Sequence, residues 1–152
     1  MDIIFLDIDG VLRTTTSDMW WSHKLIQPIP DSIFKRRFSP TSVSLINQLA
    51  NITKVKIVIT STWKSVYNLE ELKKELFSRG LFVDIIDVTP VLQNRGLEIQ
   101  CWLDMNSVNK YVVIDDNIND IIGHIDPGKI IKCSPSKGFT EIEFEKAIDL
   151  LS

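Results

Sequence analysis

Apolar residues in this chain occur in short unbroken runs and in helical repeats, and the two patterns alternate along the sequence. Residues 3–6 form an apolar run without polar alternation, which is typical of a strand buried on both faces of a parallel sheet. A second unbroken run at residues 111–114 and apolar-rich segments at residues 55–59, 83–88 and 129–133 predict further strands. Because helical segments separate these strands, we expect one α/β domain over residues 1–152, a three-layer α/β/α sandwich with a mainly parallel, Rossmann-like sheet.

The helical segments carry recognisable start signals. Ser39 and Pro40 predict the start of a helix, because serine caps a helix and proline fits its first turn. Asn68 and Thr140 are predicted to cap two later helices. Taken with the apolar repeats, these signals predict helices at residues 40–54, 69–79 and 95–103, and from Thr140 toward the end of the chain.

Residues 13–39 interrupt the alternation between the first strand and the first of these helices. Prolines in and after the segment argue against one long helix, so we expect residues 18–39 to form an irregular insertion. Its adjacent tryptophans, Trp20 and Trp21, either pack on the core, as large aromatics commonly do, or belong to a flap over a binding site. The basic cluster Lys35–Arg37 is either a solvated loop or a binding patch.

Composition narrows the class of protein without naming its function. The chain is 44% hydrophobic and 24% charged, which is typical of a globular domain. Its net charge of −3 provides no overall basic field for nucleic acid. Cys101 and Cys133 lie far apart in the sequence, and free thiols fit a reducing, cytoplasmic location. We expect no membrane segment, because no apolar stretch reaches the roughly 20 residues that span a bilayer, and the first apolar run is too short and acidic for a signal peptide.

Acidic residues follow two of the predicted strands. Asp7 and Asp9 come after the first strand and precede Gly10, while Asp115 and Asp116 come after the strand at residues 111–114. The carboxyl ends of parallel strands meet at the crevice where α/β proteins bind ligands. Carboxylates so close together repel one another unless a cation neutralises them, and oxygen ligands suit Mg²⁺. The alternative for the first pair is a plain turn with glycine at a positive φ; a calcium-binding loop lacks its further oxygen ligands here.

Hydroxyl and basic residues also lie near predicted strand and helix ends. Thr60 and Ser61 follow the strand at residues 55–59, just before a helix start. There they either bind an anion through hydroxyl and backbone N–H groups or serve as an ordinary helix cap. Lys64 lies one turn further on and faces either a phosphate or the solvent. Arg95 stands near the start of the helix before the strand that ends in Asp115.

Taken in order, these residues resemble the four motifs of the haloacid dehalogenase (HAD) superfamily of phosphohydrolases. Asp7-Ile8-Asp9-Gly10 resembles motif I, Thr60 motif II, Arg95 motif III and Asp115-Asp116 motif IV. Arg95 replaces the commoner lysine, but a guanidinium also binds phosphate oxygens. The resemblance extends from residue 1 to about residue 140. The segments 95–103 and 111–116 further resemble a compact branch that includes domains linked to RNA repair.

The resemblance implies a phosphatase that works through an aspartyl-phosphate. Asp7 would be the nucleophile, and Asp9 would be the general acid and base. Mg²⁺ would be held by carboxylates of both acidic pairs and by the backbone carbonyl of Asp9. The residues so assigned to phosphate binding are Thr60 or Ser61 and Arg95 or Lys64, and those assigned to the metal are Asp7, Asp9 and Asp115 or Asp116.

The expected partner is a phosphorylated substrate: a small molecule, a nucleotide or a nucleic-acid end. The chain has no room for a large cap domain, so the site would be open to large substrates. The tryptophan pair and the basic cluster would suit a base beside a phosphate. Three alternatives remain: a receiver-like phospho-acceptor, a phosphate-binding domain without turnover and, among enzymes, a phosphomutase. A receiver has no use for Asp9, and a mutase usually needs a cap that excludes water.

Overall fold

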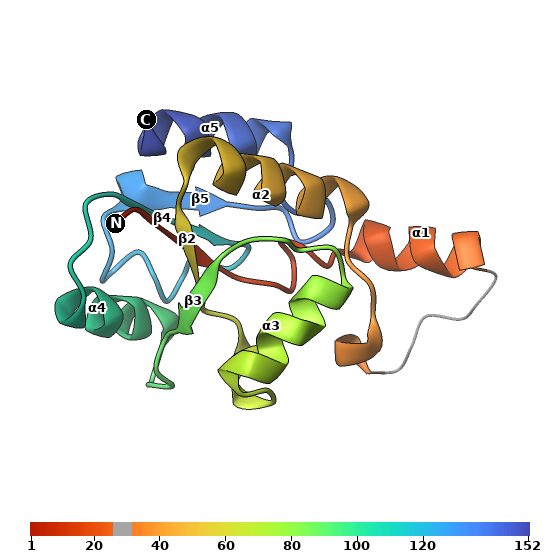
Figure 1. Ribbon diagram of the computed structural model, residues 1–152, viewed down its shortest axis with the longest axis horizontal. Helices are drawn as coiled ribbons and strands as arrows, with labels where there is room; N and C mark the ends of the chain where they lie inside the picture. Colours follow the sequence, from red (N-terminus) through yellow and green to blue (C-terminus); the bar gives the residue numbers. More distant parts are fainter. Residues whose placement is uncertain (26–31) are drawn as a thin grey trace.

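A five-stranded parallel sheet forms the centre of the protein (Figure 1). The structure is a computed structural model that describes residues 1–25 and 32–152. The strands are β1 (Ile3–Leu6), β2 (Lys56–Ile59), β3 (Ile85–Val88), β4 (Tyr111–Asp115) and β5 (Ile130–Lys132), in the spatial order β3-β2-β1-β4-β5. Each neighbouring pair is parallel. This confirms the predicted α/β fold, with β1 at the centre.

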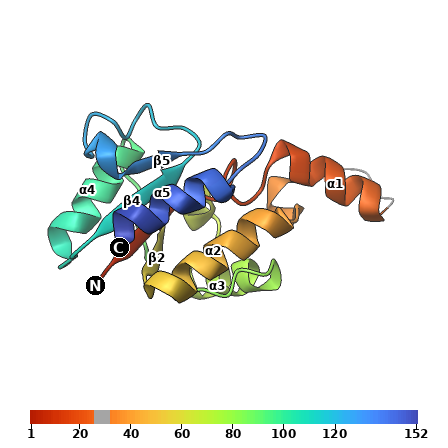
Figure 2. The same ribbon diagram turned by 90° about the horizontal axis from the view of Figure 1, so that it is seen from above.

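Helices cover both faces of the sheet. They are α1 (Thr15–Leu25), α2 (Pro40–Thr53), α3 (Leu69–Ser78), α4 (Arg95–Met105) and α5 (Glu141–Leu151), with 3₁₀ turns η1 (Ile33–Lys35), η2 (Thr62–Ser65) and η3 (Pro127–Lys129). In Figures 1 and 2, α2 and α5 lie side by side over one face, and α4 lies on the other. The predicted caps are present: Ser39 accepts a hydrogen bond from the backbone N–H of Ser42, and Asn68 forms a capping box.

Alternate residues of each strand enter two different apolar cores. In β1, Ile4 and Leu6 belong to the larger core under α2, α3 and α5, whereas Ile3 and Phe5 belong to the smaller core under α4. All four are fully buried. This double burial explains why the strand has no polar alternation. It is worth about 1.5–3 kcal/mol for each large apolar side chain.

Helix α1 corrects the expectation that residues 18–39 are irregular throughout. The helix begins because Thr14 and Ser17 cap each other: each hydroxyl accepts a hydrogen bond at 2.9 Å from the other residue's backbone N–H. No proline lies between residues 15 and 25, so nothing there interrupts a helix. Figures 1 and 2 show α1 projecting away from the sheet. Residues 26–31 of the predicted insertion, with Pro28 and Pro30, lie outside the described residues, and the chain after them forms η1 before it reaches α2.

The tryptophan pair of α1 does not pack on the core. Trp20 is 45% exposed and Trp21 is partly buried, and their rings meet edge to face at 4.6 Å. Trp21 donates a hydrogen bond from Nε1 to the backbone oxygen of Phe38 at 2.7 Å, and the guanidinium of Arg37 lies over its ring. Trp21 therefore ties α1 to the chain that returns to the sheet.

Two further expectations concern the cysteines and the membrane. Cys101 and Cys133 are both free thiols, as the sequence indicated. Within residues 1–25 and 32–152, none of the helices has the length and apolar character that a bilayer span requires.

Candidate active site

Strand register brings three candidate residues into one row at the carboxyl edge of the sheet. Leu6, the last residue of β1, pairs with the last apolar residues of both β2 and β4. The residues that follow on these three strands are Asp7, Thr60 and Asp115. Since Leu6 and its partners face the larger core, the alternation of a strand directs the next side chains to the opposite face, where α4 lies.

Three carboxylates converge at this edge. Asp7, Asp115 and Asp116 each offer one oxygen atom, and these oxygens lie within 4.8 Å of one another. Asp7 is only 4% exposed and Asp115 is fully buried. Gly10, with φ +84°, makes room for the third carboxylate, because a Cβ there would lie 2.2 Å from Asp116 Oδ2. A side chain at residue 10 would thus displace Asp116 from the group.

One guanidinium partly offsets these negative charges. Arg95 begins α4, and its Nη1 lies 3.2 Å from Asp7 Oδ1 and 2.7 Å from Asp115 Oδ2. Burial, followed by the charge of Asp115, still raises the pKa of Asp7 well above its ordinary value, although Arg95 acts in the opposite direction. Burial also raises the pKa of Asp115. We call Asp7, Asp115, Asp116 and Arg95 the carboxylate cluster; its excess of negative charge and its oxygen atoms fit a divalent cation.

Thr60 brings an unsatisfied hydroxyl to the same row. Its side chain is fully buried, and among the described residues none hydrogen-bonds to its Oγ1. A buried polar atom without a partner costs about 1–3 kcal/mol, and a phosphate oxygen placed there would remove that cost. The hydroxyl of Ser61, in contrast, already caps η2 by accepting a hydrogen bond from the backbone N–H of Trp63. The contacts therefore favour Thr60 over Ser61 as the residue that binds an anion.

Lys64, expected to face either a phosphate or the solvent, does not face the solvent: its ammonium lies among oxygen atoms at the carboxyl ends of β2 and β3. Its side chain is 4% exposed. Its ammonium contacts Glu98 at 2.6 Å, Thr89 at 2.8 Å, and two backbone oxygens. Burial lowers the pKa of Lys64, while the hydrogen bond to Glu98 raises it. Glu98 lies one turn after Arg95 on α4, so Lys64 joins the end of β2 to α4. With its ammonium already held by these oxygens, Lys64 is a weaker candidate than Arg95 for contact with a phosphate.

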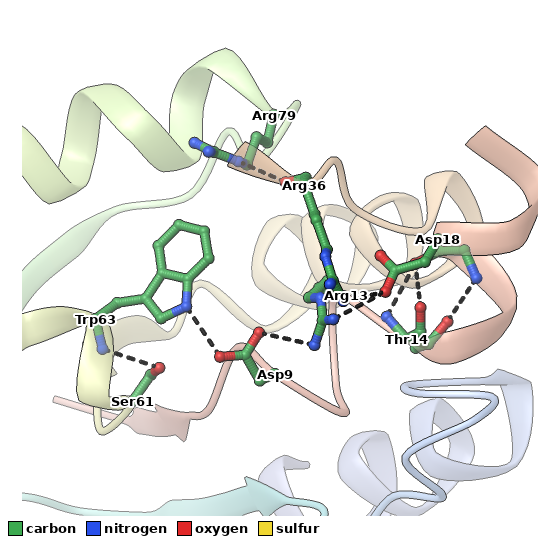
Figure 3. Close-up of polar contacts among 9 residues, drawn as sticks. Asp9, Arg13, Thr14, Asp18, Arg36, Ser61, Trp63 and Arg79 are labelled. Atoms are coloured by element: carbon green, nitrogen blue, oxygen red, sulfur yellow. Dashed lines mark hydrogen bonds and ion pairs between the residues drawn. The ribbon is translucent and has the colours of Figure 1, made fainter. Parts of the chain in front are cut away.

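The carboxylate of Asp9 contacts two residues that no pattern in the sequence singled out (Figure 3). Trp63 Nε1 donates a hydrogen bond to Asp9 Oδ2 at 3.0 Å, and Arg13 Nη1 lies 3.5 Å from Asp9 Oδ1. In the sequence, Trp63 has the appearance of a core residue and Arg13 that of a turn residue. No local pattern indicates that either side chain reaches Asp9.

A chain of ion pairs continues from Asp9 into the segment around α1. Asp18 Oδ2 accepts from Arg13 at 2.8 Å and from Arg36 at 3.0 Å, as Figure 3 shows. We call Asp9, Arg13, Asp18 and Arg36 the flap network. Arg36 belongs to the basic cluster of residues 35–37, and its pairing with Asp18 shows that this part of the cluster is not simply a solvated loop.

One family of known proteins matches most of the chain. A family model described as "HAD domain in Swiss Army Knife RNA repair proteins" matches residues 3–144, a range that contains all five strands and every residue of both charged groups. No curated protein and no solved structure matches the chain. On the strength of the family match, the chain belongs to the HAD superfamily, in the branch of HAD domains found in Swiss Army Knife RNA repair proteins.

Proposed function

We propose that this protein is a Mg²⁺-dependent phosphatase that hydrolyses a phosphate monoester through an aspartyl-phosphate on Asp7. The observation that carries the proposal is the row formed by a buried carboxylate, that of Asp7, and the Thr60 hydroxyl, which has no partner within residues 1–25 and 32–152, at the edge that Arg95 reaches from α4. Membership in a superfamily of phosphohydrolases supports the same reaction class. A nucleophile, a hydrogen-bond donor and a cation are the groups that phosphoryl transfer requires.

In the proposed first step, a carboxylate oxygen of Asp7 attacks phosphorus. The bond from phosphorus to the leaving oxygen breaks as the new bond forms, and Asp9 gives its proton to that oxygen. Thr60 and Arg95 contact the phosphoryl oxygens that carry the developing charge. General acid catalysis of this kind is worth roughly 10²–10⁴-fold.

In the second step, water attacks the phosphorus of the aspartyl-phosphate. Asp9, now ionised, takes a proton from the water, the bond between Asp7 and phosphorus breaks, and inorganic phosphate leaves. Asp7 returns as a carboxylate, and Asp9 is again protonated. One residue thus serves both steps, which is the reason why a hydrolase needs Asp9 and a receiver-like phospho-acceptor does not.

The carboxylate cluster is proposed to hold Mg²⁺ through Asp7 and through Asp115 or Asp116, with the backbone carbonyl of Asp9 as a further ligand. The cation would supply the positive charge that lets an anionic nucleophile approach an anionic phosphate. The convergence of three carboxylate oxygens and the raised pKa of Asp7 support this assignment.

We further propose a nucleotide or a nucleic-acid end as the substrate. The family description, which names RNA repair proteins, supports this choice. So does the exposed ring of Trp20 on α1, because bases stack on aromatic side chains. A phosphorylated small molecule is the alternative substrate and becomes an outcome of the experiment.

The test is Mg²⁺-dependent phosphate release from p-nitrophenyl phosphate, nucleoside monophosphates and RNA oligonucleotides with a 5′- or 3′-phosphate. Asp7→Asn and Asp9→Asn should lose activity, and Asp149→Asn, on the exposed side of α5, should keep it. We expect a substrate with a radioactive phosphoryl group to label the wild-type protein through a bond that hydroxylamine cleaves.

Phosphate release that survives in Asp7→Asn would refute the aspartyl-phosphate. Stable labelling without release would favour the receiver-like alternative, and neither labelling nor release would favour a binding domain.

A further inference from the structure

We infer that Trp63 is a positioning residue for the acid and base Asp9: its indole N–H holds Oδ2 and reserves Oδ1 for the proton that moves in both steps. The inference rests on the proposed function and deepens it, because the four motifs do not include Trp63. It begins from the 3.0 Å hydrogen bond between Trp63 Nε1 and Asp9 Oδ2 (Figure 3).

The chemistry of the indole decides which oxygen of Asp9 carries the proton. An indole N–H donates a hydrogen bond and cannot accept one. When Asp9 is protonated, its carbonyl-type oxygen is the better acceptor, so the N–H of Trp63 selects Oδ2 for that role. The proton then resides on Oδ1. In the second step, the same contact leaves Oδ1 to take the proton from water.

Packing holds the hydrogen-bond donor Trp63 rigidly, whereas the side chain of Asp9 is more exposed and needs a contact that fixes its orientation. Trp63 is fully buried in the larger core. Its ring packs beside Phe38 and Tyr67, and the guanidinium of Arg79 lies over it at 5.0 Å. The side chain of Asp9, in contrast, is 27% exposed. An indole that cannot swing restricts the rotation of the carboxylate, and a displacement of about 1 Å from reactive geometry can cost 10²-fold in rate.

The contact on the other oxygen is weaker, as the inference requires. Arg13 Nη1 lies 3.5 Å from Asp9 Oδ1, whereas Arg13 Nη2 lies 2.8 Å from Asp18. Asp18 thus holds Arg13 near Oδ1 without a short bond between Arg13 and Asp9. A leaving oxygen or a water molecule can replace this long contact at little cost.

The loop after β2 carries both a residue proposed to bind phosphate and the residue that holds Asp9. Thr60 ends the strand row, Ser61 caps η2, and Trp63 lies in η2 itself. A single rigid turn therefore carries both the hydroxyl proposed for phosphate binding and the donor that holds Asp9. This turn sets the distance between the phosphate and the proton that leaves Asp9.

The experiment compares two substrates whose leaving groups differ in their need for a proton. An alkyl phosphate releases a strongly basic alkoxide that must be protonated, whereas p-nitrophenyl phosphate releases a stable phenolate. We expect Trp63→Phe, which keeps an aromatic ring and removes Nε1, to lower kcat/KM for the alkyl phosphate by about 10–100-fold. For p-nitrophenyl phosphate the loss should be less than about threefold, since there the proton matters little.

Trp102→Phe is the matched control. Trp102 is 3% exposed, and its Nε1 also donates to a carboxylate oxygen, Asp87 Oδ2, at 2.7 Å, but it packs in the smaller core under α4. Its replacement therefore removes an equivalent, partly buried hydrogen bond that does not involve Asp9. We expect Trp102→Phe to change kcat/KM for the two substrates by the same factor.

Several outcomes would overturn the inference. In Trp63→Phe, an equal loss for both substrates, or no loss for the alkyl phosphate, would show that Trp63 does not direct the acid. If Trp63→Phe fails to fold, the indole ¹H–¹⁵N signals of the wild type and of Asp9→Asn provide the test: the Trp63 signal should shift most, and an unchanged Trp63 signal would refute the contact. A wild type inactive toward every phosphate ester would instead refute the proposed function.

Discussion

Two groups of charged side chains meet at the carboxyl edge of the sheet, and they differ in charge balance. The carboxylate cluster sets three carboxylates against one guanidinium, that of Arg95. The flap network sets Asp9 and Asp18 against Arg13 and Arg36. In the first group, burial and mutual repulsion raise the pKa of Asp7. The second group is neutral in sum when all four side chains are ionised.

The difference shows how to tell a ligand site from a structural ion-pair network. A buried group with surplus charge is stable only when something outside the chain neutralises it. A group with balanced charges is neutral without an outside ion and can hold neighbouring segments together. The carboxylate cluster stands on strand ends and on the first turn of α4, whereas the flap network joins the loop after β1 to α1 and to the chain that returns from it. The comparison therefore separates a proposed reaction centre from the support that lies beside it.

The largest expected effect comes from the nucleophile. Asp7→Asn should lower phosphate release from p-nitrophenyl phosphate by about 10⁴-fold or more, because no other group can form the covalent intermediate. In the flap network, Asp18→Asn should lower phosphate release less than about tenfold, since Asp18 is linked to Asp9 only indirectly, through Arg13. Steady-state rates at saturating Mg²⁺ measure both changes. Equal losses in the two variants would contradict the distinction between a reaction centre and its support.

The next largest effect concerns the arginines of the two groups. Arg95→Ala should lower kcat/KM by about 10²–10³-fold, because it removes a positive charge that stabilises the phosphoryl oxygens in the transition state. Arg36→Ala, in the flap network, should cost only a few fold with the same aryl phosphate. Comparable losses would show that Arg36 also contacts the substrate, and the flap network would then be a binding site.

A smaller effect should appear in stability and should be confined to the flap network. Asp18→Ala leaves Arg13 and Arg36 without their common carboxylate, and we expect the free energy of unfolding to fall by about 2 kcal/mol. Asp116→Asn, which removes one charge from the surplus in the carboxylate cluster, should leave the metal-free protein at least as stable as the wild type. Urea titration in the presence of a chelator measures both. A loss in Asp116→Asn as large as that in Asp18→Ala would contradict the comparison.

The smallest effect, counted per pH unit, is a pH dependence of the free energy of unfolding that arises from the carboxylate cluster. The pKa of Asp7 is higher in the folded state than in the unfolded chain, so its contribution to stability is fully present below about pH 4 and is lost as pH rises through the folded-state pKa. Relative to Asp7→Asn, the metal-free wild type should lose at most about 1.4 kcal/mol per pH unit across this window.

Added Mg²⁺ should change this pH dependence of stability, because the cation binds the ionised carboxylates. It should stabilise the wild type more at higher pH and have little effect on Asp7→Asn. Thermal unfolding at several pH values, with Mg²⁺ or with a chelator, tests this. A difference between wild type and Asp7→Asn that does not change between pH 4 and pH 8 would refute the assignment of the surplus charge to Asp7.

Much of the fold and part of the candidate site follow from local patterns in the sequence. Apolar-rich segments, two of them unbroken, predicted all five strands, and Ser39 and Asn68 indicated two helix starts at the residues where they occur. Once the strands are parallel, acidic residues at their carboxyl ends must share one edge. The meeting of Asp7 with Asp115 and Asp116 could therefore be expected, and Arg95 was recognisable by its position before the last of these strands.

Other contacts depend on packing between distant segments and leave no local signal. Lys64 has the appearance of a surface lysine, yet the folded chain surrounds it with oxygens from the end of β2, from the residues after β3 and from α4. Helix α1 depends on the mutual cap of Thr14 and Ser17, which in the sequence is indistinguishable from a polar turn.

The sequence by itself determined which chemical groups the sheet delivers to its edge, because the strand positions and their parallel pairing follow from the hydrophobic pattern. The tertiary structure decided how those groups are held. The direction of the Trp63 N–H toward Asp9, 54 residues away, and the pairing of Asp18 with Arg13 and Arg36 are set by the way whole elements pack. Hydrophobic periodicity records which face of an element is buried, but it does not record which polar atom on that face meets another.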